Sequence, residues 1–381
     1  MSCMNPSYDV IVIGLGTMGA ATCAYLARRG ARVLGLEQFG IPHAHGSAGG
    51  ESRVIRLSYF EHPDYVPLLL RAYELWHDLS RETGRTVLYE TGGMYLGPAD
   101  GEFIRGSIGA ARQYDLPHEV LENAEIKQRF PQFNVPEACA GIFEPRAGVI
   151  IPELAVGAFA ESALRHGAEL HGHEPVRSWS SENAGIEVTT DRARYVADRL
   201  VICGGAWSGR LLRDLGVPLA VTRQTMGWFW PKRPALFEFG RFPVWAFEDG
   251  RGGLQYGFPL LQNRPGLKVA RHLPAEATTP ESVDRTISEK DRWELLDMVD
   301  ETLPEGTGPL LSASVCLYTN TPDGHFIVDQ HPEDERVTLA CGFSGHGFKF
   351  ASVMGEALAD LAEHGRTTHP VTFLGLDRFR K

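Results

Sequence analysis

The chain has 381 residues, more than one typical hydrophobic core accommodates, so two domains are expected. With 43% hydrophobic and 22% charged residues, the composition is that of a globular protein. The formal net charge of −11 leaves no broadly basic surface, which argues against nucleic acid or an anionic membrane as a partner and favours a small-molecule task.

The N-terminal segment predicts a strand, a turn, a helix and a second strand. The apolar run at 10–13 has the length and β-branched content of a strand buried on both faces. GLGTMG at 14–19 follows, the full G-x-G-x-x-G fingerprint, and then a helical segment with small residues on one face. These small residues are Ala20, Cys23, Ala24 and Ala27. The second strand is predicted at 32–36, directly before Glu37.

This unit has the features that hold a dinucleotide. Gly14 permits the tight turn, Gly16 lets the backbone approach the pyrophosphate, and Gly19 lets the helix pack against the strand. The helix N-terminus offers free N–H groups and a partial positive charge to the phosphates. Glu37 can accept hydrogen bonds from ribose hydroxyls and would repel a 2′-phosphate, which argues against NADP.

An irregular loop and a helix are expected next. Residues 39–56, FGIPHAHGSAGGESRVIR, fit neither the helical nor the strand period, and we expect an ordered loop over a ligand. A helix is predicted at 65–80 with one apolar face. That face consists of Leu68, Leu69, Ala72, Leu75 and Trp76. Residues 86–96 alternate loosely, which indicates strands of a different, antiparallel sheet.

The next segments again have the features of a nucleotide-binding domain. A helix is predicted at 152–166, with inward positions at Leu154, Ala158 and Leu164. A buried strand at 199–203 leads into Gly204-Gly205, a second place where the backbone can approach a cofactor.

The remaining chain divides into two further parts. Residues 221–317 are rich in aromatic residues and prolines in strand-like runs that suit a substrate pocket, with one predicted helix at 289–303. The last part is predicted to contain a strand at 337–340, the turn CGFSGHGFK and a helix at 350–364. The turn would place the N-terminus of this helix next to the cofactor. This turn, combined with an N-terminal motif and an interrupted nucleotide domain, favours FAD over NAD.

These elements predict an α/β fold, α+β overall. Residues 1–85, 147–220 and 320–381 are expected to form a discontinuous, Rossmann-like FAD-binding domain. Residues 86–146 and 221–319 are expected to form a substrate domain with a mainly antiparallel sheet.

Targeting signals and metal motifs are not recognisable in the sequence. No apolar run approaches the ~20 residues of a membrane span, and the N-terminus lacks the features of a signal peptide, so a cytoplasmic protein without a membrane partner is expected. The six cysteines are scattered without C-x-x-C or metal-finger spacing. Neither a disulfide framework nor a metal site is therefore predicted.

Several long motifs, in order along the chain, resemble the monomeric sarcosine oxidase family. They are HGSAGGESRVIR, YVPLLLRAYELW, QYGFP, GLKVARH, CLYTNTPDGHFIVD and GFSGHGFKFASVMGE. This family includes N-methyltryptophan oxidase and is related to pipecolate and fructosyl amino acid oxidases. The likeness runs from about Tyr8 to the last helix.

The resemblance implies a cofactor and a set of site residues. In the family FAD is bound covalently through a cysteine thioether, and Cys316 stands at the matching position. Further cofactor-binding positions implied are Ser47, Gly345 and Gly347, in addition to the N-terminal fingerprint and Glu37.

The implied substrate pocket contains charged and aromatic residues. Arg56 and Lys349 match the residues that bind the substrate carboxylate, and two fixed cations would hold it by charge-assisted hydrogen bonds. Tyr256, Tyr318 and His272 match residues that flank the bound amine. Arg53 and Lys268 match basic residues near the flavin ring, the lysine being the family's site of dioxygen activation.

The chain also departs from the family pattern. Where sarcosine and N-methyltryptophan oxidases have His-His in the loop before the first arginine, this chain has Ala48-Gly49. The pattern near Trp245 and Ala246 also differs from that of sarcosine oxidase. Both departures argue against strict sarcosine specificity.

The resemblance implies a monomeric flavoprotein oxidase of N-methyl or other secondary or tertiary amino acids. The C–N bond is oxidised to an imine as hydride passes to FAD, the imine hydrolyses, and dioxygen is reduced to hydrogen peroxide. One alternative is a related oxidase for cyclic imino acids or fructosyl amino acids. Another is a dehydrogenase that uses a different electron acceptor, and a third is a non-catalytic flavin-binding protein.

Overall fold

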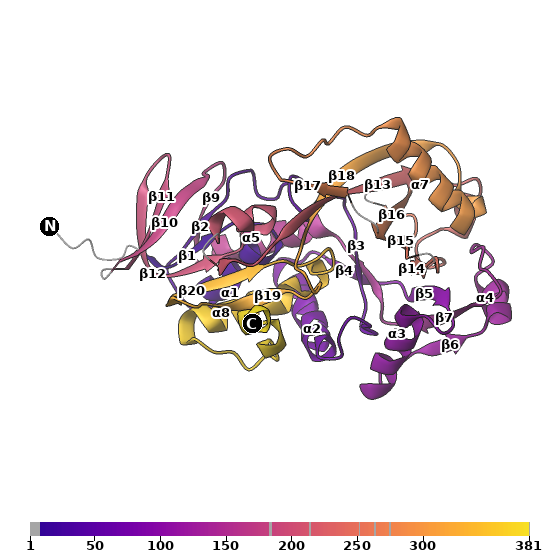
Figure 1. The fold of residues 1–381 in the computed structure, drawn as a ribbon, viewed down its shortest axis with the longest axis horizontal. Coiled ribbons are helices and arrows are strands. Elements are labelled where there is room, and N and C mark those ends of the chain that lie inside the picture. Colours follow the sequence, from indigo (N-terminus) through magenta and orange to yellow (C-terminus); the bar gives the residue numbers. More distant parts are fainter. Residues whose placement is uncertain are drawn as a thin grey trace.

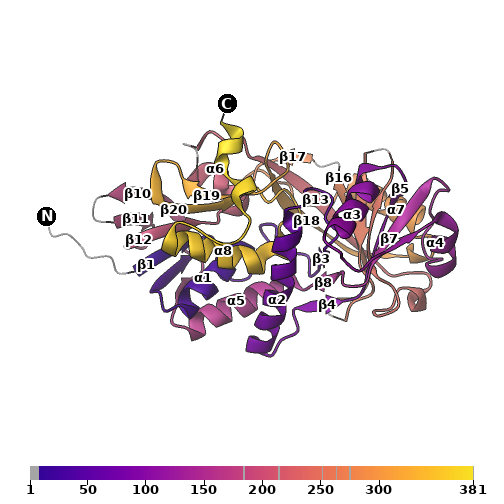
Figure 2. The ribbon, with the colours of Figure 1, turned by 90° about the horizontal axis from the view of Figure 1, so that it is seen from below.

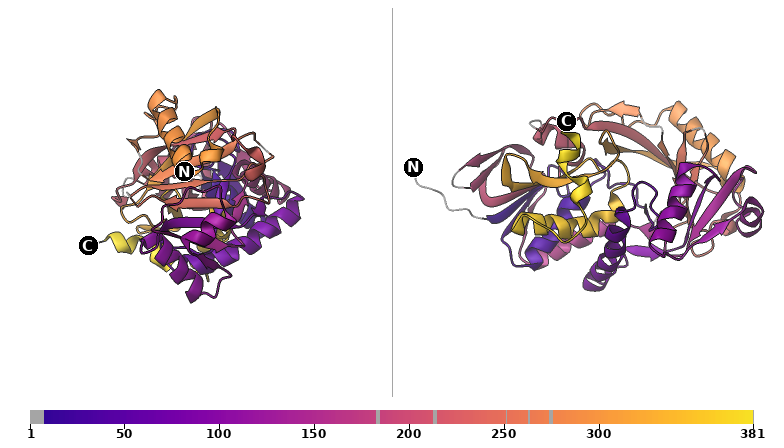
Figure 3. Two further views of the ribbon diagram at one scale, coloured as in Figure 1. Left: turned by 90° about the vertical axis from the view of Figure 1, so that its right-hand side faces the viewer. Right: turned by 60° about the horizontal axis from the view of Figure 1, so that its bottom comes forward.

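The computed structural model describes residues 8–182, 185–212, 215–250, 252–262, 264–273 and 276–380. Two large sheets lie toward opposite ends of an elongated molecule, as Figure 1 and the right-hand view of Figure 3 show. The mixed α/β class, with a Rossmann-like part and a mainly antiparallel part, is as predicted. Among the described residues, no helix combines the length and the hydropathy that a bilayer span requires.

The first sheet contains the predicted dinucleotide unit. Its strands are β1 (Tyr8–Ile13), β2 (Val33–Leu36), β9 (Glu169–His171), β10 (Val176–Glu182), β11 (Gly185–Thr190), β12 (Arg194–Ile202), β19 (Ile327–His331) and β20 (Asp334–Cys341). The strands β9, β2, β1, β12 and β20 run parallel, whereas β10, β11 and β19 are antiparallel to their neighbours. Parallel strands next to β1 place their carboxyl ends at one edge, where a nucleotide binds in such sheets.

The alternation along β1 explains how this sheet is covered. Val10 and Val12 belong to a core that includes the helices α1 (Thr17–Arg28), α2 (Tyr65–Thr83), α5 (Pro152–Arg165) and α8 (Ala351–His364). Ile11 and Ile13 point to the other face and belong to a separate cluster. Figure 2 shows the four helices gathered on one side of the sheet. Gly355 lets α8 pack closely against α1, because a Cβ there would lie 2.5 Å from the Cβ of Ala21.

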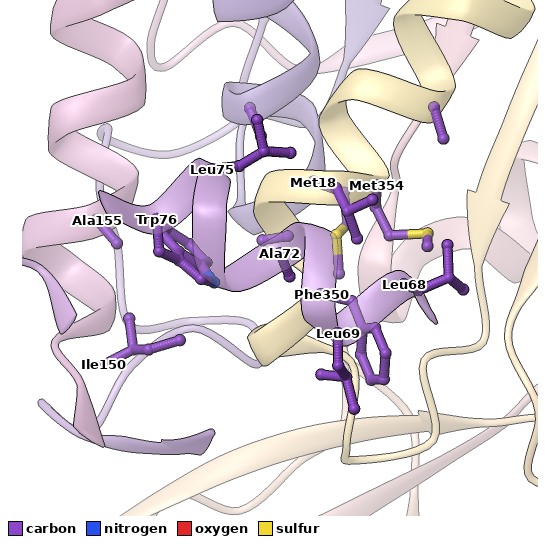
Figure 4. Close-up of a cluster of buried hydrophobic side chains, with 14 of the residues drawn as sticks. Met18, Leu68, Leu69, Ala72, Leu75, Trp76, Ile150, Ala155, Phe350 and Met354 are labelled. Atoms are coloured by element: carbon purple, nitrogen blue, oxygen red, sulfur yellow. The ribbon is translucent and has the colours of Figure 1, made fainter. Parts of the chain in front are cut away.

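Helix α2 joins the two parts of the molecule and has the apolar face that its sequence predicts. Leu68, Leu69, Ala72, Leu75 and Trp76 are all buried. Figure 4 shows these side chains beside residues of α1, α5 and α8. The helix ends at Thr83, and the next residue, Gly84, adopts a left-handed conformation (φ 67°) that other residues rarely take.

The second sheet is mainly antiparallel. Its strands are β5 (Gly93–Pro98), β6 (Glu119–Leu121), β7 (Cys139–Glu144), β13 (Ala220–Phe229), β14 (Val244–Glu248), β15 (Leu254–Gly257), β16 (Leu267–Leu273), β17 (Glu276–Thr278) and β18 (Leu310–Asn320). The pair of β5 and β14 is parallel. The associated helices are α3 (Glu102–Gln113), α4 (Asn123–Arg129) and α7 (Glu289–Thr302). Helix α7 starts with a capping box between Ser288 and Asp291.

Short elements connect the two sheets. The strands β3 (Arg53–Ile55), β4 (Leu88–Glu90) and β8 (Gly148–Ile150) form a small antiparallel sheet. The remaining helical turns are α6 (Ser208–Leu211) and 3-10 helices at Gly205–Trp207, Pro234–Leu236, Pro304–Gly306, Phe348–Phe350, Thr372–Leu374 and Leu376–Phe379. The strand ranges are compatible with the two-domain division proposed from the sequence, which stays a prediction.

Candidate functional site

A cavity of about 1270 Å³, counted with the space that opens to solvent, lies at the carboxyl ends of β1 and β2. Its wall includes the glycine fingerprint, the loop after β2, the Gly204-Gly205 turn and the glycine-rich turn before α8. Of the predicted cofactor-binding residues, the cavity is lined by Gly14, Gly16, Glu37, Ser47, Gly345 and Gly347. Segments far apart in the sequence therefore meet at one site.

The fingerprint glycines have different surroundings. Gly14 has φ +86°, and a Cβ there would lie 2.4 Å from the carbonyl oxygen of Cys203. A Cβ on Gly19 would lie 1.9 Å from the carbonyl oxygen of Gly14, so Gly19 packs the turn and does not line the cavity. A Cβ on Gly16 would meet nothing within 4 Å. The backbone at Gly16 is thus open to the cavity at the N-terminus of α1, which suits a pyrophosphate.

Glu37 is buried and its carboxylate is held from several directions. Its two oxygens accept hydrogen bonds from the backbone N–H groups of Leu15 and Phe39, each at 2.9 Å, and His43 Nε2 lies 3.5 Å away. Burial raises the pKa of Glu37, but His43 and the two N–H groups outweigh burial and hold the pKa below its usual value. An ionised acceptor at this edge suits ribose hydroxyls.

The loop after β2 is ordered by contacts to the second sheet, as the sequence predicts for a loop over a ligand. Ser47 Oγ donates to the carbonyl oxygen of Leu317 at 2.6 Å, and Arg53 donates to the carbonyls of Ser47, Gly49 and Ser52. Arg53 and Ala48 line the cavity. The loop therefore closes one side of the cavity.

The turn before α8 packs tightly against Tyr318. Gly345 has φ +76°, and a Cβ there would lie 2.4 Å from the ring of Tyr318. A Cβ on Gly347 would lie 2.5 Å from Phe343. Only glycine fits either position, and the turn brings the backbone to the cavity wall.

Cys316 lies on β18, two residues before Tyr318, so both side chains are on the same face of the strand. Tyr318 lines the cavity, whereas Cys316 does not and is 2% exposed. The thiol belongs to a cluster with Met226, Trp228 and Ala270. Burial raises the pKa of Cys316, and the nearby cations Arg53 and Lys268 oppose that rise.

Lys268 is buried at the centre of the second sheet. Its ammonium donates to the carbonyl oxygens of Gly50 at 2.7 Å and Ser52 at 2.9 Å. Burial and the nearby Arg53 lower the pKa of Lys268 well below its usual value. Two carbonyl dipoles from the loop partly offset this burial, and they fix where the amine points.

Arg56 and Lys349 both lie close to the ring of Tyr59. The guanidinium carbon of Arg56 is 4.3 Å and Lys349 Nζ is 5.1 Å from the ring centroid of Tyr59. Arg56 Nη2 donates to both carboxylate oxygens of Glu61 at 2.8 Å, and Nη1 donates to the carbonyl oxygen of Ser58 at 2.5 Å. Burial, with Arg56 close by, lowers the pKa of Lys349 to about 7.

The remaining predicted pocket residues are His272 and Tyr256, and both lie near Tyr318, which lines the cavity. His272 Nδ1 lies 3.2 Å from the hydroxyl of Tyr318, and Tyr256 packs against the cluster that contains Tyr318. Burial, with further contributions from His346 and Lys349, lowers the pKa of His272 to about 3. His272 is therefore neutral near pH 7, and it shares its surroundings with both predicted carboxylate-binding cations.

Some residues of the site are missing from the sequence-based prediction. They are His43, Glu61, His346 and Tyr59. The Tyr59 hydroxyl contacts His346 Nδ1, and His346 Nε2 lies 2.9 Å from the carbonyl oxygen of Gly324. His346 therefore donates from Nε2 and accepts from Tyr59 at Nδ1. The HGF segment just before Lys349 contains this histidine, but no local period indicates that it points toward Tyr59.

Known proteins resemble this chain over most of its length. The family described as FAD dependent oxidoreductase matches residues 9–361. Monomeric sarcosine oxidase of Streptomyces avermitilis is 47% identical over 97% of both chains. N-methyl-L-tryptophan oxidase of Yersinia pestis is 34% identical over 98% of this chain and 100% of that protein.

Among solved structures, a Tyr258Phe mutant of NikD, an amino acid oxidase essential for nikkomycin biosynthesis, superposes with a TM-score of 0.85 at 25% identity. The superposition covers 97% of each chain. The chain therefore belongs to the FAD dependent oxidoreductase family and, within it, to the group of monomeric sarcosine oxidase and N-methyl-L-tryptophan oxidase.

Proposed function

We propose that this protein is an FAD-dependent oxidase of N-methyl or other secondary or tertiary amino acids. The observation that carries the proposal is the pair of buried cations, Arg56 and Lys349, whose charges act on His272. His272 in turn contacts the hydroxyl of Tyr318, which lines the dinucleotide cavity. FAD, when bound, accepts a hydride from the substrate carbon and passes the electrons to dioxygen. The relatives named for sarcosine and N-methyltryptophan support an N-methyl amino acid as substrate.

The two cations would bind and orient the substrate carboxylate. A carboxylate held by charge-assisted hydrogen bonds in a desolvated site fixes the adjacent C–H bond in one direction. Glu61 engages Nη2 of Arg56, and the carbonyl of Ser58 engages Nη1. Lys349 would therefore be the cation available first, and Arg56 would join when its bond to Glu61 is exchanged. Glu61 also limits the excess positive charge of the buried pair.

The amine would lie on the side of His272 and Tyr318. A neutral imidazole does not repel a cationic amine or imine, and it can accept a hydrogen bond. Tyr318 and Gly345 pack ring against backbone, which leaves little freedom for the tyrosine to move. This arrangement would hold the nitrogen while the carboxylate is held by the cations.

A direct test of the proposed function is anaerobic mixing of the purified yellow protein with N-methylglycine, N-methyltryptophan or glycine. An N-methyl amino acid is expected to bleach the flavin absorbance, whereas glycine is expected to leave it nearly unchanged. Failure of every N-substituted amino acid to bleach the flavin would contradict the proposed function.

Cys316 is proposed to carry the flavin through a thioether. Its strand neighbour Tyr318 lines the cavity, and the two cations near the thiol would favour its thiolate form. The flavin is therefore expected to remain with the protein after acid precipitation, and in Cys316→Ser it should be released. Absorbance of the supernatant and the pellet measures this, with Cys139→Ser as the matched control. Quantitative release from the unmodified protein would rule out the linkage.

Binding of a simple carboxylate is expected to weaken above pH 7. The pKa of Lys349 is lowered to about 7, so its charge, and with it one of the two attractive contacts, is lost as the pH rises through that value. Propionate has no amine and stays ionised in this range. Its dissociation constant should be flat below about pH 6 and should rise by up to about tenfold per pH unit above 7.

Perturbation of the flavin spectrum by propionate from pH 6 to pH 9 measures this dependence. Lys349→Arg is the matched variant, because guanidinium stays charged throughout the range. Its dissociation constant should change little with pH. An equally steep profile in Lys349→Arg would assign the titration to another group.

A further inference from the structure

Glu144, the last residue of β7, is a carboxyl group outside the predicted pocket and is only 1% exposed. Its Oε1 accepts a hydrogen bond from the backbone N–H of Leu57 at 2.6 Å, and its Oε2 accepts one from the backbone N–H of Ser58 at 2.8 Å. These two residues directly follow Arg56 in the chain. A residue of the second sheet therefore holds the backbone next to the predicted carboxylate-binding side chain.

Both oxygens of Glu144 act as acceptors, and an ionised carboxylate suits this arrangement best. A glutamine, or a protonated carboxyl group, would turn a donor toward one of the two N–H groups. Burial raises the pKa of Glu144, and the N–H groups of Leu57 and Ser58, together with the nearby Arg56, oppose that rise. Burying a charge is costly unless donors surround it, and the donors here are backbone groups of the segment that carries Arg56.

The guanidinium of Arg56 is attached to the same segment. Its Nη1 donates to the carbonyl oxygen of Ser58 at 2.5 Å, while the N–H of Ser58 donates to Glu144. Ser58 therefore links the buried carboxylate to the buried cation. Four ring centroids lie between 4.3 and 6.0 Å from the guanidinium carbon, those of Tyr59, Phe60, Tyr95 and Phe103. Aromatic faces attract a planar cation, so these rings and Ser58 together determine where the guanidinium lies.

The strand pair that presents Glu144 also presents one of these rings. Glu144 on β7 is paired with Gly93 on β5, and Tyr95 is two residues further along β5. A Cβ on Gly93 would lie 2.6 Å from the Tyr95 hydroxyl and 2.5 Å from the Cβ of Ala147, so only glycine fits opposite Glu144. The second sheet thus contacts the Arg56 segment through both a carboxylate and an aromatic ring.

We infer that Glu144 is a positioning residue for substrate binding, which acts through Ser58 to set the place of the Arg56 guanidinium. The inference rests on the proposed function, in which Arg56 binds the substrate carboxylate. Glu61 contacts the guanidinium directly, and its side chain is 18% exposed, so a substrate carboxylate can replace it. Glu144 is buried and contacts only the backbone of the segment among the described hydrogen bonds, so it stays in place during that exchange.

Glu144→Gln tests this role because it keeps the shape of the side chain and removes one acceptor. The dissociation constant of propionate, measured by perturbation of the flavin spectrum, is expected to rise roughly tenfold. In anaerobic flavin reduction by an N-methyl amino acid, the second-order rate constant should fall by a similar factor, and the limiting rate at saturation should change by less than about threefold.

The same substitution in Arg56→Ala separates positioning from general structural support. If Glu144 acts through Arg56, adding Glu144→Gln to Arg56→Ala should change the second-order rate constant of reduction by less than about twofold. Asp291→Asn, another buried carboxylate changed to an amide, is the matched control, since its partners Arg223 and Ser288 lie outside the predicted pocket. It should bind propionate as the unmodified protein does.

Glu144→Asp keeps the charge and provides the test if the amide variant does not fold. Its shorter side chain reaches both N–H groups less well, so the dissociation constant of propionate should rise by about threefold. Unchanged propionate binding in a folded Glu144 variant would overturn the inference, and so would equal losses with and without Arg56. Failure of every N-methyl amino acid to reduce the flavin of the unmodified protein would instead contradict the proposed function.

Discussion

Lys268→Met is expected to slow reoxidation of the reduced flavin by dioxygen at least about a hundredfold. The first electron transferred to dioxygen creates a compact anion, and a cation about 4 Å away stabilises it by about 4 kcal/mol at an effective dielectric constant of 20. A hundredfold change in rate requires about 2.7 kcal/mol, so the loss of this charge is sufficient. The carbonyls of Gly50 and Ser52 hold the amine in place, and a developing anion would favour its protonated form.

Flavin reduction depends far less on this charge. Anaerobic reduction by a good substrate should change by less than about tenfold in the same variant, since no such anion forms in that step. Stopped-flow traces of the two half-reactions separate the effects. Lys232→Met removes an exposed lysine and serves as the matched control. Unchanged reoxidation in Lys268→Met would leave Lys268 with a structural role in the second sheet.

Arg56→Ala is expected to lower kcat/KM for an N-methyl amino acid by roughly ten- to a hundredfold. Removing one charge-assisted partner of a carboxylate costs about 1.5–3 kcal/mol. The variant also leaves the Glu61 carboxylate without its bidentate partner near the site, and this negative charge would oppose a second carboxylate. Arg56→Ala combined with Glu61→Gln should therefore recover part of the lost efficiency.

The test compares two substrates in each variant. Steady-state peroxide production is measured with an N-methyl amino acid and with an amine of similar size that lacks the carboxylate. The second substrate should be poor in every variant and little affected by Arg56→Ala. Equal losses for both substrates would show that Arg56 maintains the structure of the pocket and does not bind the carboxylate.

Much of the first sheet could be predicted because local patterns determine it. The fingerprint at 14–19 requires a strand before it and a helix after it, and the structure has both. The apolar face of α2 follows from helical periodicity. Helical periodicity also explains why one prediction in α5 is wrong. Leu164 is 55% exposed, because six residues after the buried Ala158 correspond to a rotation of about 240° around the helix.

The site was predictable only where a motif carries it. The cavity-lining residues run from Ile13 to Phe348. No period relates Arg56 on one segment to Lys349 on another. Glu61 was missed because an acidic residue shortly after an arginine is common in loops, and its bidentate contact exists only in the folded chain. A small cavity beside Lys268 is lined by the loop after β2, by the segment between β15 and β16, and by the strands β13 and β16, so sequence patterns give no sign of it.

The most direct test of the oxidase function is the stoichiometry of a single aerobic reaction. Purified protein is mixed with limiting N-methylglycine, N-methyltryptophan, proline, pipecolate or fructosyl-glycine, and dioxygen uptake, hydrogen peroxide and aldehyde are measured together. For at least one N-methyl amino acid we predict one hydrogen peroxide and one formaldehyde per dioxygen consumed, with loss of both in the variant that combines Arg56→Ala and Lys349→Met. Turnover with an artificial electron acceptor but without peroxide would contradict the oxidase function and identify a dehydrogenase.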